Sequence, residues 1–255
     1  MGHAKNEHFL FFAASVSDNE VILSGQEAHH LLHVLSFGIG DRFKATNGKG
    51  ALWECELSGA GRSEAVGKIL SRTIASANNP EVHLFAGLPE RDAFELLIEH
   101  CCALGITRFI PVECTYSQQP WWRTKWEKSR RRFERKMIAA CKQSHNLWLP
   151  AVENPVTLAA SLALCCGTVA YADQDTDTRL NDYGKLPGDV ISCFVGPPGG
   201  FSPQEKAALD QCGARKLCLS ARRLRTELAA TVASALLMLP DGDINASKEG
   251  SLPRR

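Results

Sequence analysis

The sequence lacks any uninterrupted apolar run near the roughly 20 residues that cross a bilayer. Its first residues, MGHAKNEHFLFF, lack the basic and then apolar pattern of a secretory leader. It also lacks a charge excess, because 29 Lys and Arg stand against 28 Asp and Glu, a formal net charge of +1. With 44% hydrophobic residues, these features exclude disordered, collagen-like and coiled-coil classes and predict a globular, cytoplasmic protein without a membrane partner.

The ten cysteines contain no C-x-x-C spacing, so the ligand pattern of a structural zinc site is missing. They lie in apolar stretches of a 255-residue chain, which can bury a core without disulfides, so we expect reduced core thiols. His29 and His33 are one helical turn apart, but no Glu stands between them and no third ligand is near. This pair is expected on a helix surface, and no metal is predicted.

The chain divides into two regions with different sequence patterns. Up to Thr73, short β-like runs alternate with glycine turns, which predicts a small barrel or sandwich. From Glu81, apolar strand-like runs alternate with helical ones, which predicts a parallel sheet covered by helices on both faces. The residues from Asp241 are polar and aperiodic. We therefore assign residues 1–74 to a β-domain, 75–240 to an α/β domain and 241–255 to a flexible tail.

The expected elements follow from these periodicities. Strands are predicted at residues 20–23, 42–46, 51–57, 65–70, 82–87, 106–112, 168–172, 190–196 and 216–220. Helices are predicted at residues 26–35, 93–104, 125–144, 156–165, 203–211 and 227–239.

A glycine-rich loop, GPPGG at residues 196–200, follows the predicted strand 190–196. A helix begins directly after it, with Ser202 as N-cap, Pro203 at the first helical position and Glu205 completing a capping box. Ligands bind at the carboxyl ends of strands in open α/β sheets, and glycines there let the backbone approach a ligand. The loop is therefore a pocket candidate, and the alternative is a tight turn. No P-loop or G-x-G-x-x-G pattern is present.

An arginine-rich loop follows the next predicted strand. Arg222, Arg223 and Arg225 leave its carboxyl end, and Thr226 and Glu227 open the last predicted helix. Arginines at such a strand end can hold phosphates. The alternative is a solvated loop with Glu227 as a first-turn partner of the helix dipole, and for Arg223 we favour this alternative.

Together, the two loops resemble those of the ribosomal RNA small subunit methyltransferase E family, whose members carry G-P-E-G-G-[FL]-S and L-G-P-R-x-L-R-T-E-T-A after successive strands. The resemblance covers nearly the whole chain. Its further motifs here are His29-His30-Leu31, Gly40-Asp41, Leu88-Pro89, Leu104-Gly105-Ile106, Phe109-Ile110-Pro111 and Gln143-Ser144.

The resemblance implies an N-terminal PUA-like β-barrel and a SPOUT-type α/β domain whose C-terminal segment forms a trefoil knot. It also implies S-adenosylmethionine as methyl donor, N3 of a uridine in small-subunit (16S) ribosomal RNA as acceptor, and a homodimer. The ribosomal RNA itself or the small ribosomal subunit is then the partner.

The resemblance assigns roles to residues of the two loops. The implied cofactor-binding residues are Ala172, Gly196, Pro197, Gly199, Gly200, Leu219, Ser220 and Leu224. The implied catalytic residues are Arg222, Arg225, Thr226 and Glu227. An arginine can favour the uridine anion or hold the RNA backbone, and Glu227 is either a base or a group that orients an arginine.

Positive charge is concentrated in residues 121–136, where eight Lys and Arg stand against two Glu. This local charge of +6 predicts an electrostatic footprint for a polyanion, whereas the alternative is a solvated helix face. Aromatic residues recur there at helical spacing and are expected in the core, with Trp121 the freer candidate for stacking on a base. The candidate RNA-binding residues are Arg123, Lys125, Arg130, Arg131 and Arg132.

Some positions depart from the family pattern. Pro198 stands where the family usually has Glu, Ala221 where it has Pro, and Leu228 where it has Thr. The retained glycines favour the first hypothesis, a uridine-N3 methyltransferase. The departures keep the alternative open, an RNA-binding protein of the same fold with lost or redirected methyltransferase activity. An enzyme for another adenosine-containing ligand has only fold-level analogy in its favour.

Overall fold

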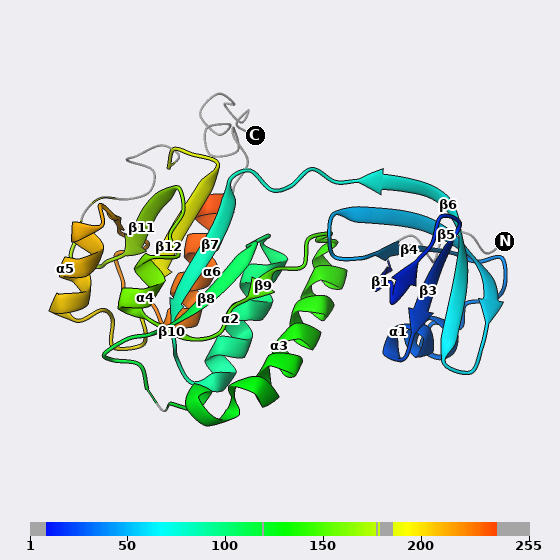
Figure 1. Ribbon diagram of the computed structural model, residues 1–255, viewed down its shortest axis with the longest axis horizontal. Coiled ribbons are helices and arrows are strands. Elements are labelled where there is room, and N and C mark those ends of the chain that lie inside the picture. The colour runs from blue at the N-terminus through cyan, green and yellow to red at the C-terminus, as the bar shows by residue number, and fades with distance from the viewer. Residues whose placement is uncertain (1–8, 119, 177, 179–185, 239–255) are drawn as a thin grey trace, which may run out of the picture.

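The structure is a computed structural model that describes residues 9–118, 120–176, 178 and 186–238. Two β-sheets lie beside each other along the long axis of the molecule (Figure 1). The N-terminal sheet has six strands in the order β1-β4-β5-β6-β3-β2. The C-terminal sheet has seven, in the order β10-β8-β7-β12-β11-β13, with β9 paired to β8.

The N-terminal sheet curls around its own core, in which Phe11, Phe43 and Leu57 are fully or almost fully buried. The first and last strands in this order, β1 and β2, follow one another in the chain, so the sheet curls back on itself, in keeping with the small barrel or sandwich that the sequence predicts. Its strands are β1 (Leu10–Phe12), β2 (Ser15–Val16), β3 (Glu20–Ser24), β4 (Arg42–Thr46), β5 (Ala51–Ala60) and β6 (Glu64–Ile74).

The four strands predicted in this region are confirmed, whereas β1 and β2 are too short to show a period of two. The predicted helix 26–35 is confirmed in position, but only its first turn is α-helical. That turn, α1 (Gln26–His29), continues into a π-helical segment, His30–Val34. The rings of His29 and His33 lie 5.1 Å apart. In the described part of the chain, no group of three His, Cys, Asp or Glu side chains is placed to hold a metal.

The C-terminal sheet is parallel at every strand pair, as predicted. Its central strands are buried on both faces, because their side chains alternate between two helical layers. Its strands are β7 (Glu81–Gly87), β8 (Arg108–Glu113), β9 (Ala151–Val152), β10 (Val156–Thr157), β11 (Thr168–Ala172), β12 (Val190–Val195) and β13 (Arg215–Leu217).

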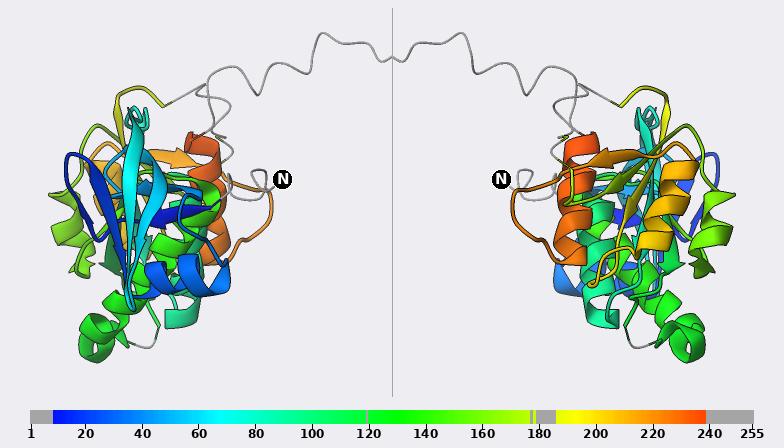
Figure 2. Two further views of the ribbon diagram at one scale, coloured as in Figure 1. Left: turned by 90° about the vertical axis from the view of Figure 1, so that its right-hand side faces the viewer. Right: turned by 90° about the vertical axis from the view of Figure 1, so that its left-hand side faces the viewer.

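Helices cover both faces of this sheet, which confirms the prediction (Figures 1 and 2). On one face, Leu84 belongs to a core shared with α2, α3 and α6, and on the other Phe85 packs in a cluster with α4 and α5. The predicted helix 156–165 is shorter than expected, because Thr157 is extended and caps the helix through its side chain. The helices are α2 (Arg91–Ala103), α3 (Trp122–Ser144), α4 (Leu158–Leu162), α5 (Pro203–Gln211) and α6 (Thr226–Met238).

The two sheets meet at the carboxyl end of α3. The Gly50 N–H donates to the Leu147 carbonyl (2.9 Å), and a Cβ at position 50 would lie 2.3 Å from the Trp148 ring. Lys142 of α3 forms an ion pair with Glu27 of α1 (2.7 Å). Glycine at position 50 therefore lets the N-terminal sheet dock closely on the α/β domain.

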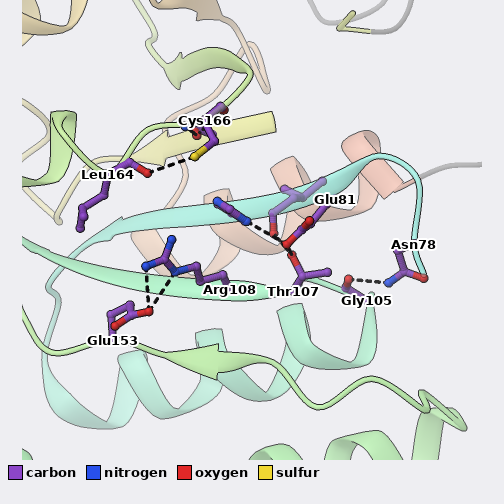
Figure 3. Close-up of polar contacts among 11 residues, drawn as sticks. Asn78, Glu81, Gly105, Thr107, Arg108, Glu153, Leu164 and Cys166 are labelled. Atoms are coloured by element: carbon purple, nitrogen blue, oxygen red, sulfur yellow. Dashed lines mark hydrogen bonds and ion pairs between the residues drawn. The ribbon is translucent and has the colours of Figure 1, made fainter. Parts of the chain in front are cut away.

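At the amino end of the parallel sheet, polar side chains pair with one another (Figure 3). Arg108, at the start of β8, forms an ion pair with Glu153 at 2.9 Å. The Thr107 hydroxyl lies 3.4 Å from the carboxylate of Glu81, which begins β7. These contacts pair the charged side chains of the amino end within the chain, whereas the buried Nδ1 of His83 in β7 has no hydrogen-bond partner among the described residues.

All ten cysteines are free thiols, as expected. Six are buried, but Cys166 and Cys212 are exposed, so the expectation of a wholly buried set was wrong. Cys212 is the C-cap of α5, and Cys166 precedes β11 in a loop. Element ends face solvent even when the neighbouring sequence is apolar. The predicted tail, 241–255, lies outside the described residues. Among the described residues, no helix is long and apolar enough to span a membrane.

Candidate functional site

A cavity of about 250 Å³ opens at the carboxyl ends of β11, β12 and β13. The glycine-rich loop and the arginine-rich loop both line it, although they follow different strands. All eight residues predicted to bind a cofactor are in its wall: Ala172, Gly196, Pro197, Gly199, Gly200, Leu219, Ser220 and Leu224. The cavity lies where ligands bind in open α/β sheets.

Each glycine of the loop is favoured over other residues for a different structural reason. Gly200 has φ +75°, a left-handed conformation that strains other residues. A Cβ at Gly196 would lie 3.2 Å from the Cα of Gly200, so this glycine closes the loop on itself. At Gly199, the Cβ would lie 2.6 Å from the Cβ of Tyr116. Position 199 is thus glycine because a tyrosine packs against it, a reason that the sequence did not reveal.

Hydrogen bonds join the two loops into one wall. The Thr226 hydroxyl donates to the Gly196 carbonyl at 3.0 Å, and Thr226 is 3% exposed. The Arg223 guanidinium donates to the Pro198 carbonyl at 3.1 Å. Arg223 is exposed, as expected for a solvated loop, and it also ties the arginine-rich loop to the glycine-rich loop.

The predicted capping box of α5 is confirmed. The Ser202 hydroxyl accepts from the Glu205 N–H at 3.3 Å, and the Glu205 carboxylate accepts from the Ser202 N–H at 2.7 Å. Pro203 occupies the first turn, as predicted. The other carboxylate oxygen of Glu205 accepts from the Thr115 N–H at 2.7 Å. This buried carboxylate therefore fixes the turn after β8 to the amino end of α5.

Sequence reasoning missed a charged part of the cavity wall. Lys206 lies between Asp173 (2.8 Å) and Asp175 (2.7 Å), and all three line the cavity. The hydrogen bond and charge of Lys206 lower the pKa of Asp175. Burial opposes ionisation of Lys206, but its bonds to the two carboxylates outweigh burial and raise its pKa. Asp173 follows β11 directly, so the strand-end rule applied to the glycine loop could have found it.

The four predicted catalytic residues do not all reach the cavity. Arg222 and Thr226 line it, whereas Arg225 and Glu227 flank Thr226 and are outside the lining. Arg222 and Arg225 are exposed, and neither side chain has an ion-pair partner in the described part of the chain. Both guanidinium groups are therefore available to an anionic ligand.

The basic helix α3 uses part of its charge within the protein. Its cations toward α2 and β8 are bound to carboxylates, so two of the five predicted RNA-binding residues, Arg123 and Arg132, have intramolecular partners. The pairs are Arg132 with Glu95 (2.8 Å), Lys136 with Glu99 (2.7 Å) and Arg123 with Glu113.

Other cations of α3 remain open to solvent. Lys125, Arg130 and Arg131 are exposed and have no ion-pair partner among the described residues. On the helix, Arg131 shares its outward face with Lys128 and Arg135, opposite the buried side chains. These three cations form the outward stripe of α3, and they remain available to a polyanion.

The aromatic residues of α3 are core residues, as predicted for the stripe that includes Trp122 and Phe133. Trp121 is also held in place, because its indole N–H donates to the Pro89 carbonyl (3.0 Å) and its ring stacks on Trp126. The expectation that Trp121 is free to stack on a base was therefore wrong. Trp121 lies just before the first residue of α3, outside the helical spacing, and it packs against the core.

Comparison with known proteins adds two family matches. Residues 77–238 match the model of an RNA methyltransferase domain, and residues 23–70 match that of an RNA methyltransferase PUA domain. A relative from Mycobacterium tuberculosis, named Ribosomal RNA small subunit methyltransferase E, is 26% identical over 233 residues and 88% of each chain. One of the same name from Synechocystis is 29% identical, over 84% of this chain and 71% of its own.

Solved structures show the same fold. A Ribosomal RNA small subunit methyltransferase E from Neisseria gonorrhoeae, bound to S-adenosyl methionine, superposes with a TM-score of 0.79 at 24% identity, over 89% of this chain and 95% of that one. A protein from Legionella pneumophila, also solved with bound S-adenosyl methionine, superposes with a TM-score of 0.80 at 21% identity, over 90% of this chain and 96% of that one. The domain match covers more than half of the chain, and with these relatives it assigns the chain to the ribosomal RNA small subunit methyltransferase E family.

Proposed function

We propose that this chain transfers a methyl group from S-adenosylmethionine to N3 of a uridine in 16S ribosomal RNA. The observation that carries the proposal is the single cavity wall made by the two loops on which the family resemblance rests. The family supplies the reaction class, and the cavity supplies a site for it at the carboxyl ends of three parallel strands.

The residues of the cavity fit the proposed cofactor. Leu217, Leu219 and Leu224 give an apolar wall that suits an adenine ring, next to the open backbone of the glycine loop. Asp173, Asp175 and Lys206 form one cluster with two carboxylates and one cation, which can bind the charged amino-acid end of the ligand. The fit thus includes both apolar and charged parts of the molecule.

The protein's main contribution to methyl transfer is positioning. When bound, S-adenosylmethionine supplies an electrophilic methyl group that an in-line nucleophile can accept. The uridine N3 must lose its proton, and Arg222, in the cavity wall, favours the resulting anion electrostatically. Arg225, in the same loop but outside the cavity lining, adds to this electrostatic stabilisation or binds the adjacent phosphate. Glu227 is either the base or the group that orients Arg225.

RNA binding is proposed for two surfaces. The outward stripe of α3, Lys128, Arg131 and Arg135, is open to solvent and supplies unpaired positive charge. The N-terminal sheet adds the PUA-type domain, which docks beside the end of the same helix. Phosphate contacts of this kind give affinity that falls as salt rises.

The proposal includes a homodimer and a trefoil knot in the C-terminal segment. Leu228 of α6 is 50% exposed and Leu96 of α2 is 41% exposed. The two helices pack together, and Thr231 meets His100 at 3.4 Å between them. Exposed leucines on these two packed helices, of which α6 contributes Ala229 to the cavity wall, support a self-complementary interface. Sedimentation at micromolar concentration is expected to give twice 27.9 kDa, and a monomer contradicts the dimer.

The experiment is methyl transfer from labelled S-adenosylmethionine to small ribosomal subunits that lack the modification, followed by mapping of the labelled nucleotide. We expect label at N3 of one uridine. Cofactor and RNA binding without transfer favours the alternative, an RNA-binding protein with lost or redirected activity, for which Pro198 in the cavity wall is the relevant departure. Absence of cofactor binding in calorimetry contradicts the proposal outright.

A further inference from the structure

A rigid turn follows β8 beside the cavity. The Ser117 N–H donates to the Cys114 carbonyl at 3.0 Å, and the Cys114 N–H donates to the Ser117 hydroxyl at 3.1 Å. The Thr115 N–H is held by the buried carboxylate of Glu205 at 2.7 Å. Three hydrogen bonds thus fix this turn, whose two central residues are Thr115 and Tyr116.

Tyr116 rests on the glycine loop but is not covered by the rest of the protein. A Cβ at Gly199 would lie 2.6 Å from its Cβ and 3.1 Å from its Cγ, whereas the residue remains 45% exposed. Its hydroxyl has no hydrogen-bond partner in the described ranges. One side of Tyr116, including its ring atoms Cγ and Cδ2, therefore lies against the glycine-rich loop, and the residue remains partly open to solvent.

The position of Tyr116 connects two features already described. Gly199, beneath it, lines the cavity. The basic helix α3 begins six positions later in the chain, and its Arg123 forms an ion pair with Glu113, just before the turn. Tyr116 thus packs on the cavity wall and belongs to the segment that leads from β8 to the basic helix α3.

RNA that presents N3 of a base to a cavity must separate that base from its neighbours. The loss of stacking is costly, and proteins offset it by stacking nucleobases on exposed aromatic side chains. Tyr116 lies outside the cavity lining, so it is placed for a base next to the one that enters. Stacking tolerates any base, because every base has a π-face.

We propose that Tyr116 is a stacking platform for the nucleotide adjacent to the target uridine. This inference rests on the proposed function, because it takes the cavity as the methyl-transfer site. It adds a positioning residue, which acts by holding the RNA strand and not by touching the reacting atoms. The anchoring by Glu205 and Gly199 keeps the ring in one orientation, so little ordering is needed when RNA binds.

The test is a cycle of protein and RNA changes. The probe is fluorescein-labelled single-stranded oligoadenylate with one central uridine, used intact or with an abasic site next to the uridine. Tyr116→Leu keeps a side chain against Gly199 but removes the π-face, and Tyr116→Phe keeps the ring. We expect Tyr116→Leu to weaken binding of the intact RNA about tenfold, to leave the abasic RNA unaffected, and Tyr116→Phe to resemble the wild type.

Calorimetry with S-adenosylmethionine separates stacking from loop support. Unchanged cofactor affinity in Tyr116→Leu, together with the RNA cycle above, supports the platform. Loss of cofactor affinity with unchanged RNA affinity overturns it, because Tyr116 then only supports the glycine loop. Equal weakening of intact and abasic RNA also overturns it.

The RNA measurements need no methyl transfer, so they distinguish this inference from the proposed function. If the wild type methylates RNA but Tyr116→Leu does not weaken binding of intact RNA more than binding of abasic RNA, only the stacking proposal is contradicted. If the coupling is present but no transfer to any RNA occurs, the platform holds and the methyltransferase assignment fails.

Discussion

The two ends of the parallel sheet are built from the same strands but differ in whether their charged side chains are paired. At the amino end, Arg108 and Glu153 pair at 2.9 Å, and Glu81 is bound by its neighbours (Figure 3). At the carboxyl end, Arg222 and Arg225 are exposed without an ion-pair partner in the described residues, beside a cavity. One end stabilises the fold, and the other keeps charge and backbone available for a ligand.

The largest expected effect is on turnover at the carboxyl end. Arg225→Ala should lower the methyl-transfer rate at saturating RNA about 100-fold or more, because it removes charge stabilisation made mainly in the transition state. RNA affinity should fall only modestly. Transfer of labelled methyl groups measures the rate, with Arg108→Ala as the amino-end control. If Arg225→Ala reduces RNA affinity alone, Arg225 is a phosphate contact and not a catalytic residue.

Two glycines give a matched pair for the two ends. Gly200 follows β12 and has φ +75°, whereas Gly213 precedes β13 and has φ +79°, and neither position has an atom within 4 Å of a Cβ. Alanine at either position should destabilise the protein similarly, by about 1 kcal/mol, because positive φ strains it. Only Gly200→Ala should lower S-adenosylmethionine affinity, by about tenfold or ~1.4 kcal/mol.

Urea unfolding and calorimetry measure the two quantities separately. Equal cofactor affinity in both alanine variants would remove the glycine loop from the binding site. A large difference in unfolding free energy between them would mean that their backbones are not equivalent controls.

Within α3, neighbouring arginines should differ in what they support. Arg131→Ala should lower RNA affinity and reduce the slope of log affinity against log salt by about 1, with stability unchanged. Arg132→Ala should instead destabilise the fold by about 1 kcal/mol, because Glu95, whose side chain is 4% exposed, loses its nearest cation. Filter binding across salt concentrations and urea unfolding distinguish the two. The same effect from both variants contradicts this division of the helix.

The smallest expected effect is at the amino end. Arg108→Ala removes an ion pair whose side chains are 29% and 40% exposed, so it should cost about 0.5 kcal/mol of stability. Cofactor affinity and methyl transfer should equal those of the wild type. A loss of transfer in this variant would break the comparison between the two ends.

Much of the cavity was predictable because its main loops are local in sequence. The GPPGG loop and its capping box are contiguous, and the strand-end rule places them at a ligand site. The pairs Lys206 with Asp173 and Tyr116 with Gly199 join distant segments. Only the order of strands in the sheet brings such segments together, so no local sequence pattern could predict their contacts.

The errors have similar physical causes. Trp121 was taken as free because it is outside the helical stripe, but a residue before a helix follows a different chain direction and packs on Trp126. Cys166 and Cys212 are exposed because they lie at element ends, where apolar neighbours do not ensure burial. Strands β1 and β2 have three and two residues, too few for an alternating pattern to appear.

The most direct test of the central claim is amide chemical-shift mapping by NMR as S-adenosylmethionine is added to the full chain. The account predicts shifts at Gly196, Gly199, Gly200, residues 217–224 and Lys206, which surround the cavity, and none at Glu81, Thr107 or Arg108. Shifts concentrated at the amino end of the sheet, or no shifts at saturating cofactor, would contradict it.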